Sequence, residues 1–440
     1  MRDWLGMSAG DLGRGIEAGR IDPRDLARTF LDAIDGHRFA ARIYARTTPD
    51  RASAEAAAAA DRAKRGLRRG PLDGVPISWK DLFDTAGVET EAGSALLKGR
   101  VPDRDARVLT AATRAGLVCL GKTHMTELAF SGLGLNPITA SPPCANDEAA
   151  VSGGSSSGAA TSVAFGLAPA AIGSDTGGSV RIPAAWNDLV GLKTRHGRLS
   201  LDGVVPLCPS FDTVGPLCRT VEDASLLLAA LSDGKSADLS NSSLSGVRML
   251  VLETVAFDDI EDTPRVAFEA AVETLGTAGA EILRGTVPQV AEAMPLSRIL
   301  FAPEAYGTWR ETIEGNPDVM FPEILERFRG GREILAWEYV AGWQALKRLR
   351  AEYAASVAGF DAVILPSCPI RPPSAKTLAT DGEAYKTANL MTLRNTRIAN
   401  LMGLAAVTLP TGTPSCGITL QGPVEERLLR VAAAVERALS

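Results

Sequence analysis

The fold is decided by a short polar turn that follows the apolar run Ala170-Ala171-Ile172. The turn reads Gly173-Ser174-Asp175-Thr176-Gly177-Gly178-Ser179. Because its glycines leave the backbone free to curl, the N–H groups of Thr176, Gly177 and Gly178 can point into one concavity. Such a nest of donors stabilises an oxyanion, and Ser179 stands at its end. Taken alone, a Gly-rich serine loop is usually only a turn, so Ser179 is a candidate nucleophile only together with a suitable base.

This serine needs a base, and Lys80 is the best candidate. It ends the apolar strand Val75-Pro76-Ile77-Ser78-Trp79. A lysine acts as a base only when it is neutral, so burial must lower its pKa from about 10.4 to near 7–8. A second serine-rich loop, Ser152-Gly153-Gly154-Ser155-Ser156-Ser157-Gly158, opens a helix. We expect this loop to meet both Lys80 and Ser179.

Three other motifs fail on their chemistry. The Gly154–Gly158 segment matches G-x-S-x-G, the nucleophile elbow of hydrolases that use a histidine base. In those enzymes an acid and then a histidine follow the serine, but the last histidine here, His196, comes only about forty residues later and the rest of the chain has none. The Gly116–Thr123 segment matches a phosphate loop, but Leu117 to Leu120 form an apolar strand whose N–H groups belong to a sheet. The three histidines share no metal-ligand spacing, so no metal and no other cofactor is expected.

Composition excludes several classes of protein. The 440 residues carry a net charge of −6, and the one dense basic cluster, at 64–69, closes a helix, so a nucleic-acid partner is not expected. No apolar run reaches about 18 residues, so no membrane partner is expected. Six scattered cysteines form no C-x-x-C pair and suit a reducing compartment. Because the sequence shows no recognisable targeting signal, the predicted location is cytoplasmic.

Apolar periodicity and turn residues predict alternating strands and helices. Helices are expected at 23–38, 50–69, 103–115, 156–166, 221–232, 264–279, 333–356 and 424–439. Strands are expected at 75–79, 117–120, 247–252, 363–365, 405–409 and 416–420. This alternation favours an α/β layered fold around a mixed, mostly parallel sheet. No repeat or low-complexity linker divides the chain, which predicts one domain over 1–440 with a catalytic core at about 72–233.

Several long motifs resemble the amidase signature family. Besides the two serine loops, they are Asp73-Gly74-Val75-Pro76-Ile77-Ser78-Trp79-Lys80-Asp81, Val180-Arg181-Ile182-Pro183-Ala184-Ala185, Val190-Gly191-Leu192-Lys193 and Phe211-Asp212-Thr213-Val214-Gly215-Pro216. The similarity is dense from about 72 to 233 and weaker at 361–367 and 395–412. The resemblance implies an α/β/α sandwich. Departures at Ser152, Asn187-Asp188 and Thr194 lie outside the implied catalytic residues.

The resemblance also implies a Ser-Ser-Lys triad. Ser179 matches the nucleophile, Ser155 the bridging serine and Lys80 the base. The oxyanion hole maps to the N–H groups of Thr176, Gly177, Gly178 and Ser179. A cis peptide is implied before the bridging serine, at Gly154–Ser155, and Ser156 is a further supporting residue.

Two charged residues flank the nucleophile. Asp175 and Arg181 lie close enough in sequence to form an ion pair that supports the turn, although Arg181 could instead face an anionic substrate. Aromatic and aliphatic residues at 125, 130, 133, 135, 309 and 337 are candidates for a pocket or for the core. The sequence does not decide between these two roles.

The preferred function is hydrolysis of a small carboxamide through an acyl-enzyme on Ser179. One rival is the glutaminase subunit of a tRNA-dependent amidotransferase, which would need partner subunits. A second rival is a non-catalytic interaction protein that retains the fold. The expected partner is a small-molecule amide, and a homodimer is a candidate assembly.

Overall fold

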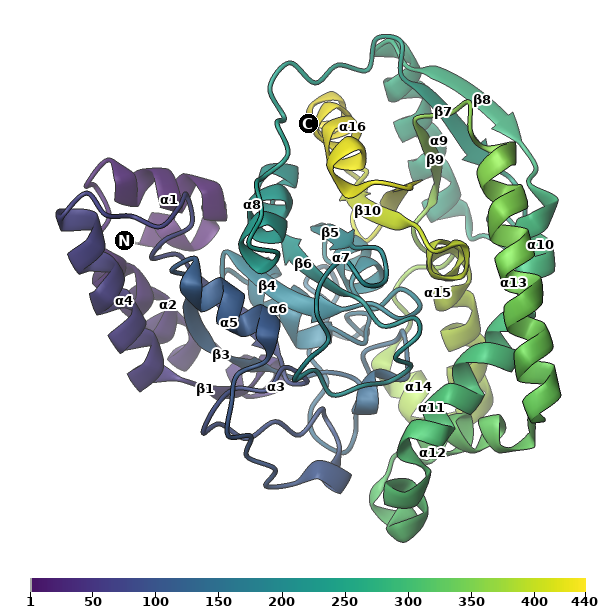
Figure 1. Ribbon diagram of the computed structural model, residues 1–440, viewed down its shortest axis with the longest axis horizontal. Coiled ribbons are helices and arrows are strands. Elements are labelled where there is room, and N and C mark those ends of the chain that lie inside the picture. The colour runs from purple at the N-terminus through teal and green to yellow at the C-terminus, as the bar shows by residue number, and fades with distance from the viewer. Residues whose placement is uncertain (1) are drawn as a thin grey trace.

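The computed structural model describes residues 2–440, and one mixed sheet crosses them. Its eleven strands in these residues lie in the order β1-β3-β2-β4-β6-β5-β10-β11-β9-β7-β8. Their bounds are β1 Tyr44–Thr47, β2 Pro76–Lys80, β3 Val118–Thr123, β4 Ala170–Ser174, β5 Val190–Lys193, β6 Val214–Cys218, β7 Arg248–Leu252, β8 Glu281–Gly285, β9 Ala362–Pro366, β10 Ala405–Pro410 and β11 Gly417–Gly422. Helices surround the sheet (Figure 1).

Helices lie in most of the connections between the strands. They are α1 Ala9–Glu17, α2 Pro23–Asp35, α3 Ala40–Ile43, α4 Pro49–Lys64, α5 Arg107–Arg114, α6 Ser157–Ala164, α7 Arg181–Trp186, α8 Val221–Leu231, α9 Asp262–Thr277, α10 Pro288–Ala293, α11 Leu296–Gly315, α12 Pro322–Arg329, α13 Ala336–Ser356, α14 Ala375–Thr380, α15 Gly382–Met402 and α16 Glu425–Leu439. None of the helices in residues 2–440 is long and apolar enough to span a membrane.

The central strands are buried on both faces, which requires helices on each side. Ala171 of β4 belongs to a small apolar cluster with Ala159 and Val163 of α6. Its neighbours Ala170 and Ile172 point the other way and join the main core, to which α8 contributes. Helix α6 approaches this closely because its first turn is built from small residues.

The predicted α/β class and mixed sheet are confirmed, but the expected excess of parallel pairs is wrong. Six of the ten neighbouring strand pairs in residues 2–440 are antiparallel. The excess comes from β5, β6, β10 and β11 in the middle of the sheet. Strands β10 and β11 form a hairpin, and β5 and β6 went unrecognised because they are short and contain glycine or proline.

Two long helices were also missed, and both bear on the site. Helix α11 contains Pro303, which breaks the sequence pattern of a helix, and α15 carries many polar residues on buried positions. Figure 1 shows α11 and α12 near α15, and residues of all three helices line a chamber together with the loop that follows β4. The C-terminal half therefore completes one wall around the serine loops.

Candidate active site

Lys80 ends β2 with its side chain fully buried. Its Nζ lies 2.7 Å from Ser155 Oγ and 2.8 Å from Ser174 Oγ. Within residues 2–440, no carboxylate oxygen lies within 4.0 Å of this amine. Burial lowers the pKa of Lys80 to about 7, although the charges of Asp212 and Asp175 partly oppose this. The amine is therefore largely neutral in mildly alkaline water.

The Ser155 loop is held by close backbone contacts. The Gly154–Ser155 peptide bond is cis, as the resemblance to the family implied. The Gly154 N–H donates to the Gly132 carbonyl at 2.8 Å. A Cβ on Gly154 would lie 2.6 Å from both Gly134 N and Thr126 Oγ1, so a side chain does not fit there. These contacts direct Ser155 Oγ at the lysine.

Ser156 links three parts of the site. Its hydroxyl donates to the Ser174 carbonyl at 3.2 Å and accepts from the Ser174 N–H at 3.3 Å. Its own N–H donates to the Ser179 carbonyl at 3.1 Å. A Cβ on Gly173 would approach Ser156 Oγ to 2.6 Å, which explains the glycine before Ser174. Ser156 thus fixes the two serine loops relative to each other.

The turn after β4 wraps around the carboxylate of Asp175. This carboxylate accepts hydrogen bonds from Gly178 N–H at 2.9 Å and Val180 N–H at 3.2 Å. In residues 2–440, the N–H groups of Thr176, Gly177 and Ser179 have no protein acceptor. The free donors therefore differ from those expected, because the Gly178 N–H is already occupied.

Gly178 has a different and strict steric role. Its φ of +141° is open to glycine, and a Cβ there would lie 2.1 Å from Thr396 Oγ1. The same Thr396 hydroxyl donates to the Gly177 carbonyl at 2.8 Å. Helix α15 therefore closes directly over the turn, and this long-range contact has no signal in the turn's own sequence.

Asp175 and Arg181 form the expected ion pair. Arg181 Nε and Nη2 each lie 3.0 Å from a different carboxylate oxygen, and both side chains are fully buried. The remaining contacts of Arg181 are to the Thr396 carbonyl and to Asn400 Oδ1, both at 2.6 Å. Burial alone would raise the pKa of Asp175, but Arg181 brings it down to about 2. Arg181 is thus committed to protein partners and does not face a substrate.

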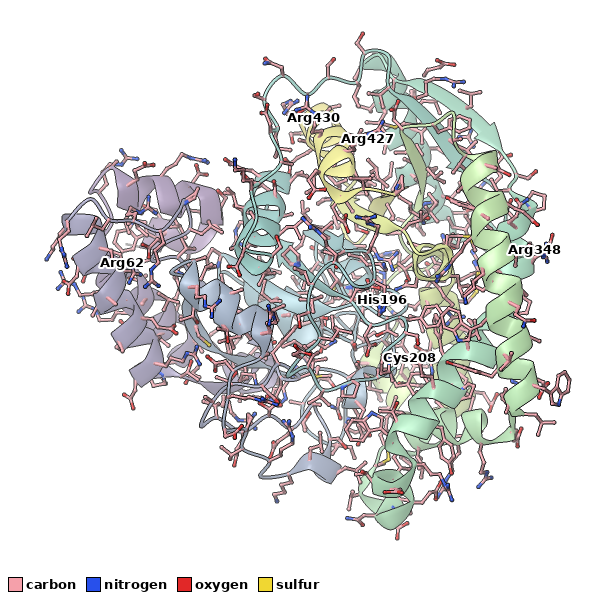
Figure 2. All side chains as sticks on the ribbon, in the orientation of Figure 1. Arg62, His196, Cys208, Arg348, Arg427 and Arg430 are labelled. Carbon is pink, nitrogen blue, oxygen red and sulfur yellow. The ribbon has the colours of Figure 1, made fainter. Side chains whose placement is uncertain are left out.

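Two residues that had no predicted role belong to the site. Ser174 is the second hydroxyl on Lys80. Asp212 accepts from Thr176 Oγ1 at 2.5 Å and from the N–H groups of Leu207 and Cys208. Figure 2 marks Cys208 and His196 near the centre of the molecule. The signal for Asp212 was its place in the Phe211–Pro216 motif, which indicated similarity but not function.

Two histidines lie near the serine loops. His196 Nδ1 lies 3.1 Å from the Asp212 backbone carbonyl, and burial lowers the pKa of His124 to about 4. Neither ring contacts Ser155 or Ser179. Residues 2–440 contain no group of three or more His, Cys, Asp or Glu side chains placed to hold a metal ion.

Two cavities with shared lining residues lead away from Ser179. A chamber of about 20 Å³ is lined by Ser179, with Thr176 and Gly177 beside it. An outer cavity of about 470 Å³ opens toward α11, α12 and α15. The residues that line both are Phe130, Phe301, Arg327 and Arg397. Of the expected pocket residues, Phe130 is at the site, whereas Trp337 is two-thirds exposed and lies elsewhere.

Comparisons with known proteins agree on one family. A family model described as Amidase matches residues 25–424. A 2-amino-5-chloromuconic acid deaminase from Comamonas testosteroni is 36% identical, over 98% of this chain and 96% of the relative. One subunit of the glutamyl-tRNA(Gln) amidotransferase from Anaeromyxobacter dehalogenans is 32% identical, over 98% and 95%.

Solved structures share the whole architecture. A crystal structure described as an amidase superposes with a TM-score of 0.88 at 29% identity and covers 98% of this chain and 99% of its own. Peptide amidase from Stenotrophomonas maltophilia superposes with a TM-score of 0.84 at 26% identity, covering 98% and 96%. The likeness therefore extends over both halves of the sheet.

Proposed function

The chain belongs to the amidase family and is a hydrolase of amide C–N bonds, and we propose that Ser179 is its nucleophile, Ser155 its bridging serine and Lys80 its base. The observation that carries the proposal is the surroundings of Lys80. A buried amine that contacts two hydroxyls and no carboxylate is a base rather than a structural cation.

The relay runs from the nucleophile to the lysine. Neutral Lys80 takes the proton of Ser155, Ser155 takes the proton of Ser179, and Ser179 Oγ attacks the amide carbonyl carbon. The C–N bond then breaks as the same relay, reversed, protonates the leaving nitrogen. Water attacks the resulting acyl-enzyme through the same groups and releases a carboxylate.

The oxyanion would be bound by three N–H groups rather than four. Thr176, Gly177 and Ser179 have N–H groups without a protein acceptor, and they line the chamber around the nucleophile. Asp175 holds the N–H of Gly178 and so shapes the turn from behind. Preorganised donors of this kind need no rearrangement as the charge develops.

A small carboxamide is the proposed substrate, with a carboxylate and ammonia or an amine as products. The Comamonas relative is named as a deaminase of an amino-substituted acid, which favours ammonia as the nitrogen product here too. A reducing, cytoplasmic location is part of the proposal because all six cysteines are free and buried. The homodimer stays a prediction.

Glutamine hydrolysis within an amidotransferase is the second candidate, favoured by the 32% identical amidotransferase relative. The two candidates separate in one assay of the purified chain alone. Ammonia release from small carboxamides with no release from L-glutamine supports the stand-alone amidase. Glutaminase activity that appears only with added partner subunits and tRNA supports the rival.

The nucleophile is tested by Ser179→Ala. Loss of a nucleophile from a cooperating triad costs roughly 10⁴–10⁶ in rate, and we expect unchanged far-ultraviolet circular dichroism. Mass spectrometry of the wild type with a slow substrate should place the acyl group on Ser179. Ser162→Ala is the matched control, because Ser162 is buried on α6 and its hydroxyl contacts Ser78 Oγ and the Ala159 carbonyl rather than the proposed relay. Near-normal turnover by Ser179→Ala, or an adduct on another residue, would overturn the assignment.

A further inference from the structure

Two arginines border the nucleophile chamber without a carboxylate partner. Arg327 comes from α12 and Arg397 from α15, and both line the inner chamber and the outer cavity. Among residues 2–440, no Asp or Glu oxygen lies within 4.0 Å of either guanidinium. This contrasts with Arg181, which is completely paired.

Arg397 is nine-tenths buried and has one polar contact. Its Nη1 lies 3.3 Å from Ser297 Oγ. Burial lowers the pKa of its guanidinium to about 9, and the nearby charge of Arg327 acts in the same direction. A guanidinium nevertheless stays charged at neutral pH, so this position holds an uncompensated cation.

Arg327 is also incompletely satisfied. Its Nη1 is sealed from solvent and has no hydrogen-bond partner in residues 2–440. The guanidinium carbon lies 4.5 Å from the centre of the Phe130 ring, within the range of a cation–π contact. Burial lowers the pKa of Arg327 as well. Both arginines thus place strong donors at the junction of the two cavities.

The acidic residues of the outer cavity do not neutralise the pair. Glu326 binds Lys386 at 3.1 Å, and Glu323 lies beyond ion-pair distance of both guanidiniums. Leaving a buried charge without a partner is strongly destabilising. An anionic ligand would supply the missing partner.

Resting on the proposed function, we propose that Arg327 and Arg397 bind a carboxylate on the acyl part of the substrate, so that the substrates are amides of dicarboxylic acids. The amide carbon lies at Ser179 and the acyl chain runs past Phe130 to the guanidiniums. A planar carboxylate suits the fork of donors that an arginine presents.

The first test compares acidic amides with neutral counterparts of the same length. Succinamate, glutaramate and adipamate are assayed for ammonia release beside their methyl esters. A charge-assisted contact of about 1.5–3 kcal/mol corresponds to roughly 10–100-fold in kcat/KM. We expect the wild type to prefer one of the three acids by at least that factor. The preferred length reports the distance from Ser179 to the arginines.

The arginine variants carry the decisive comparison. Arg397→Met and Arg327→Met should lose roughly 10–100-fold in kcat/KM for the acidic amides and little for the esters. Arg298→Met is the matched control, because Arg298 lines the same outer cavity but is three-quarters exposed. Equal losses on acids and esters, or a wild type that prefers the esters, would overturn the proposal.

A binding measurement separates this proposal from the assigned chemistry. Calorimetry with glutarate and Ser179→Ala should show binding that Ser179→Ala/Arg397→Met loses, with thermal melting as a check on folding. If glutarate binds in this way but no amide is hydrolysed by the wild type, the anion site stands and the amidase assignment falls. If the wild type hydrolyses neutral amides and neither arginine variant changes the rate for acidic amides, the amidase assignment stands and the anion site falls.

Discussion

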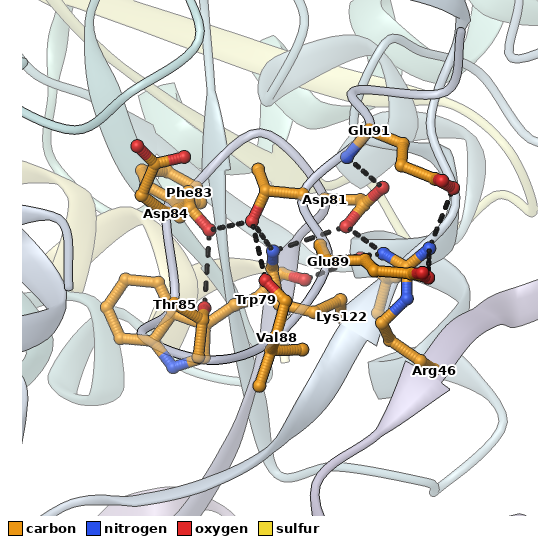
Figure 3. Close-up of polar contacts among 12 residues, drawn as sticks. Arg46, Trp79, Asp81, Phe83, Asp84, Thr85, Val88, Glu89, Glu91 and Lys122 are labelled. Atoms are coloured by element: carbon orange, nitrogen blue, oxygen red, sulfur yellow. Dashed lines mark hydrogen bonds and ion pairs between the residues drawn. The ribbon is translucent and has the colours of Figure 1, made fainter. Parts of the chain in front are cut away.

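Lys80 and Lys122 are both fully buried on neighbouring strands, yet their surroundings differ. The strand register pairs Lys122 with Trp79, so the two lysines point to opposite faces of the sheet. Lys122 Nζ lies 3.2 Å from Asp81 Oδ1 and 2.9 Å from Thr90 Oγ1. Figure 3 shows this cluster with Arg46 bound to the same carboxylate.

The difference lies in the partners and not in the burial. Burial lowers the pKa of both amines, but the charge of Asp81 opposes this for Lys122 at contact distance. For Lys80 the opposing charges, on Asp212 and Asp175, act only from outside contact distance. A buried lysine beside hydroxyls is available as a base, whereas one beside a carboxylate is part of the scaffold.

The largest expected effect is on activity. Lys80→Met should lower kcat/KM for amides by at least roughly 10⁴, because the relay loses its base. Lys80→Arg should fail equally, since a guanidinium does not release its proton at working pH. Lys122→Met should keep its rate within about tenfold of the wild type, because it contacts none of the three relay residues. If the two methionine variants lost activity equally, the comparison between the lysines would break.

Lys122→Met should lower the stability of the protein although it changes activity little. Lys122→Met leaves the carboxylate of Asp81 with Arg46 as its remaining cation, and breaking a buried pair costs about 3–5 kcal/mol. Urea unfolding at pH 7 measures the loss. Lys122→Met/Asp81→Asn removes both partners and should recover part of it. A single variant as stable as the wild type would show that the pair contributes nothing.

Lys80→Met should instead stabilise the protein at pH 7. The folded pKa of about 7 lies below the unfolded value, so between about 7 and 10.5 the unfolded chain binds the extra proton. Wild-type stability should therefore rise with pH across this window, and the advantage of Lys80→Met, on the order of 2–4 kcal/mol at pH 7, should shrink. Lys193, whose pKa burial also lowers to about 7, is common to both proteins and cancels.

The pH dependence of the rate tests whether Lys80 is the base. If the neutral amine of Lys80 is the base, as proposed, wild-type kcat/KM should rise about tenfold per pH unit at low pH and level off above a pKa of about 7. Lys122→Met should keep this profile. An inflection near 4 would instead indicate His124, whose pKa lies there.

The smallest expected effect belongs to Ser174, whose hydroxyl contacts the proposed base. Ser174→Ala removes one of two hydroxyls on Lys80 and should lower kcat by about tenfold with little change in KM. Ser174→Thr keeps the hydroxyl and should restore most of the rate. A change in KM alone, or no rescue by threonine, would argue against positioning.

Much of this site could be predicted from local sequence, because its functional residues lie within short segments of the chain. The expected contact between Lys80 and Ser155, and the pair of Asp175 with Arg181, are present. The occupied Gly178 N–H could not be foreseen, since it depends on how the Asp175 side chain turns back. Hydrogen bonds, unlike residue types, are set by three-dimensional packing.

Distant parts of the chain were harder to place. Thr396, Arg397 and Asn400 lie on α15, which carries many polar residues at buried positions, and Arg327 lies on the short helix α12. Strands β5 and β6 lay inside motifs that indicated similarity but contain glycine or proline, so neither was identified as a strand. Because these two strands were missed, the sequence analysis overestimated the share of parallel strand pairs.

The contact of α15 with the turn at 173–179 suggests that two fragments of the enzyme could be used to report an interaction between other proteins. Thr396 and Asn400 bind the turn from beyond the exposed connection between α8 and β7, at 232–247. A chain cut in that connection would carry Lys80, Ser155 and Ser179 on one fragment and the groups that brace them on the other. Neither fragment should release ammonia alone, and activity on mixing would measure how tightly any two fused proteins bring the halves together.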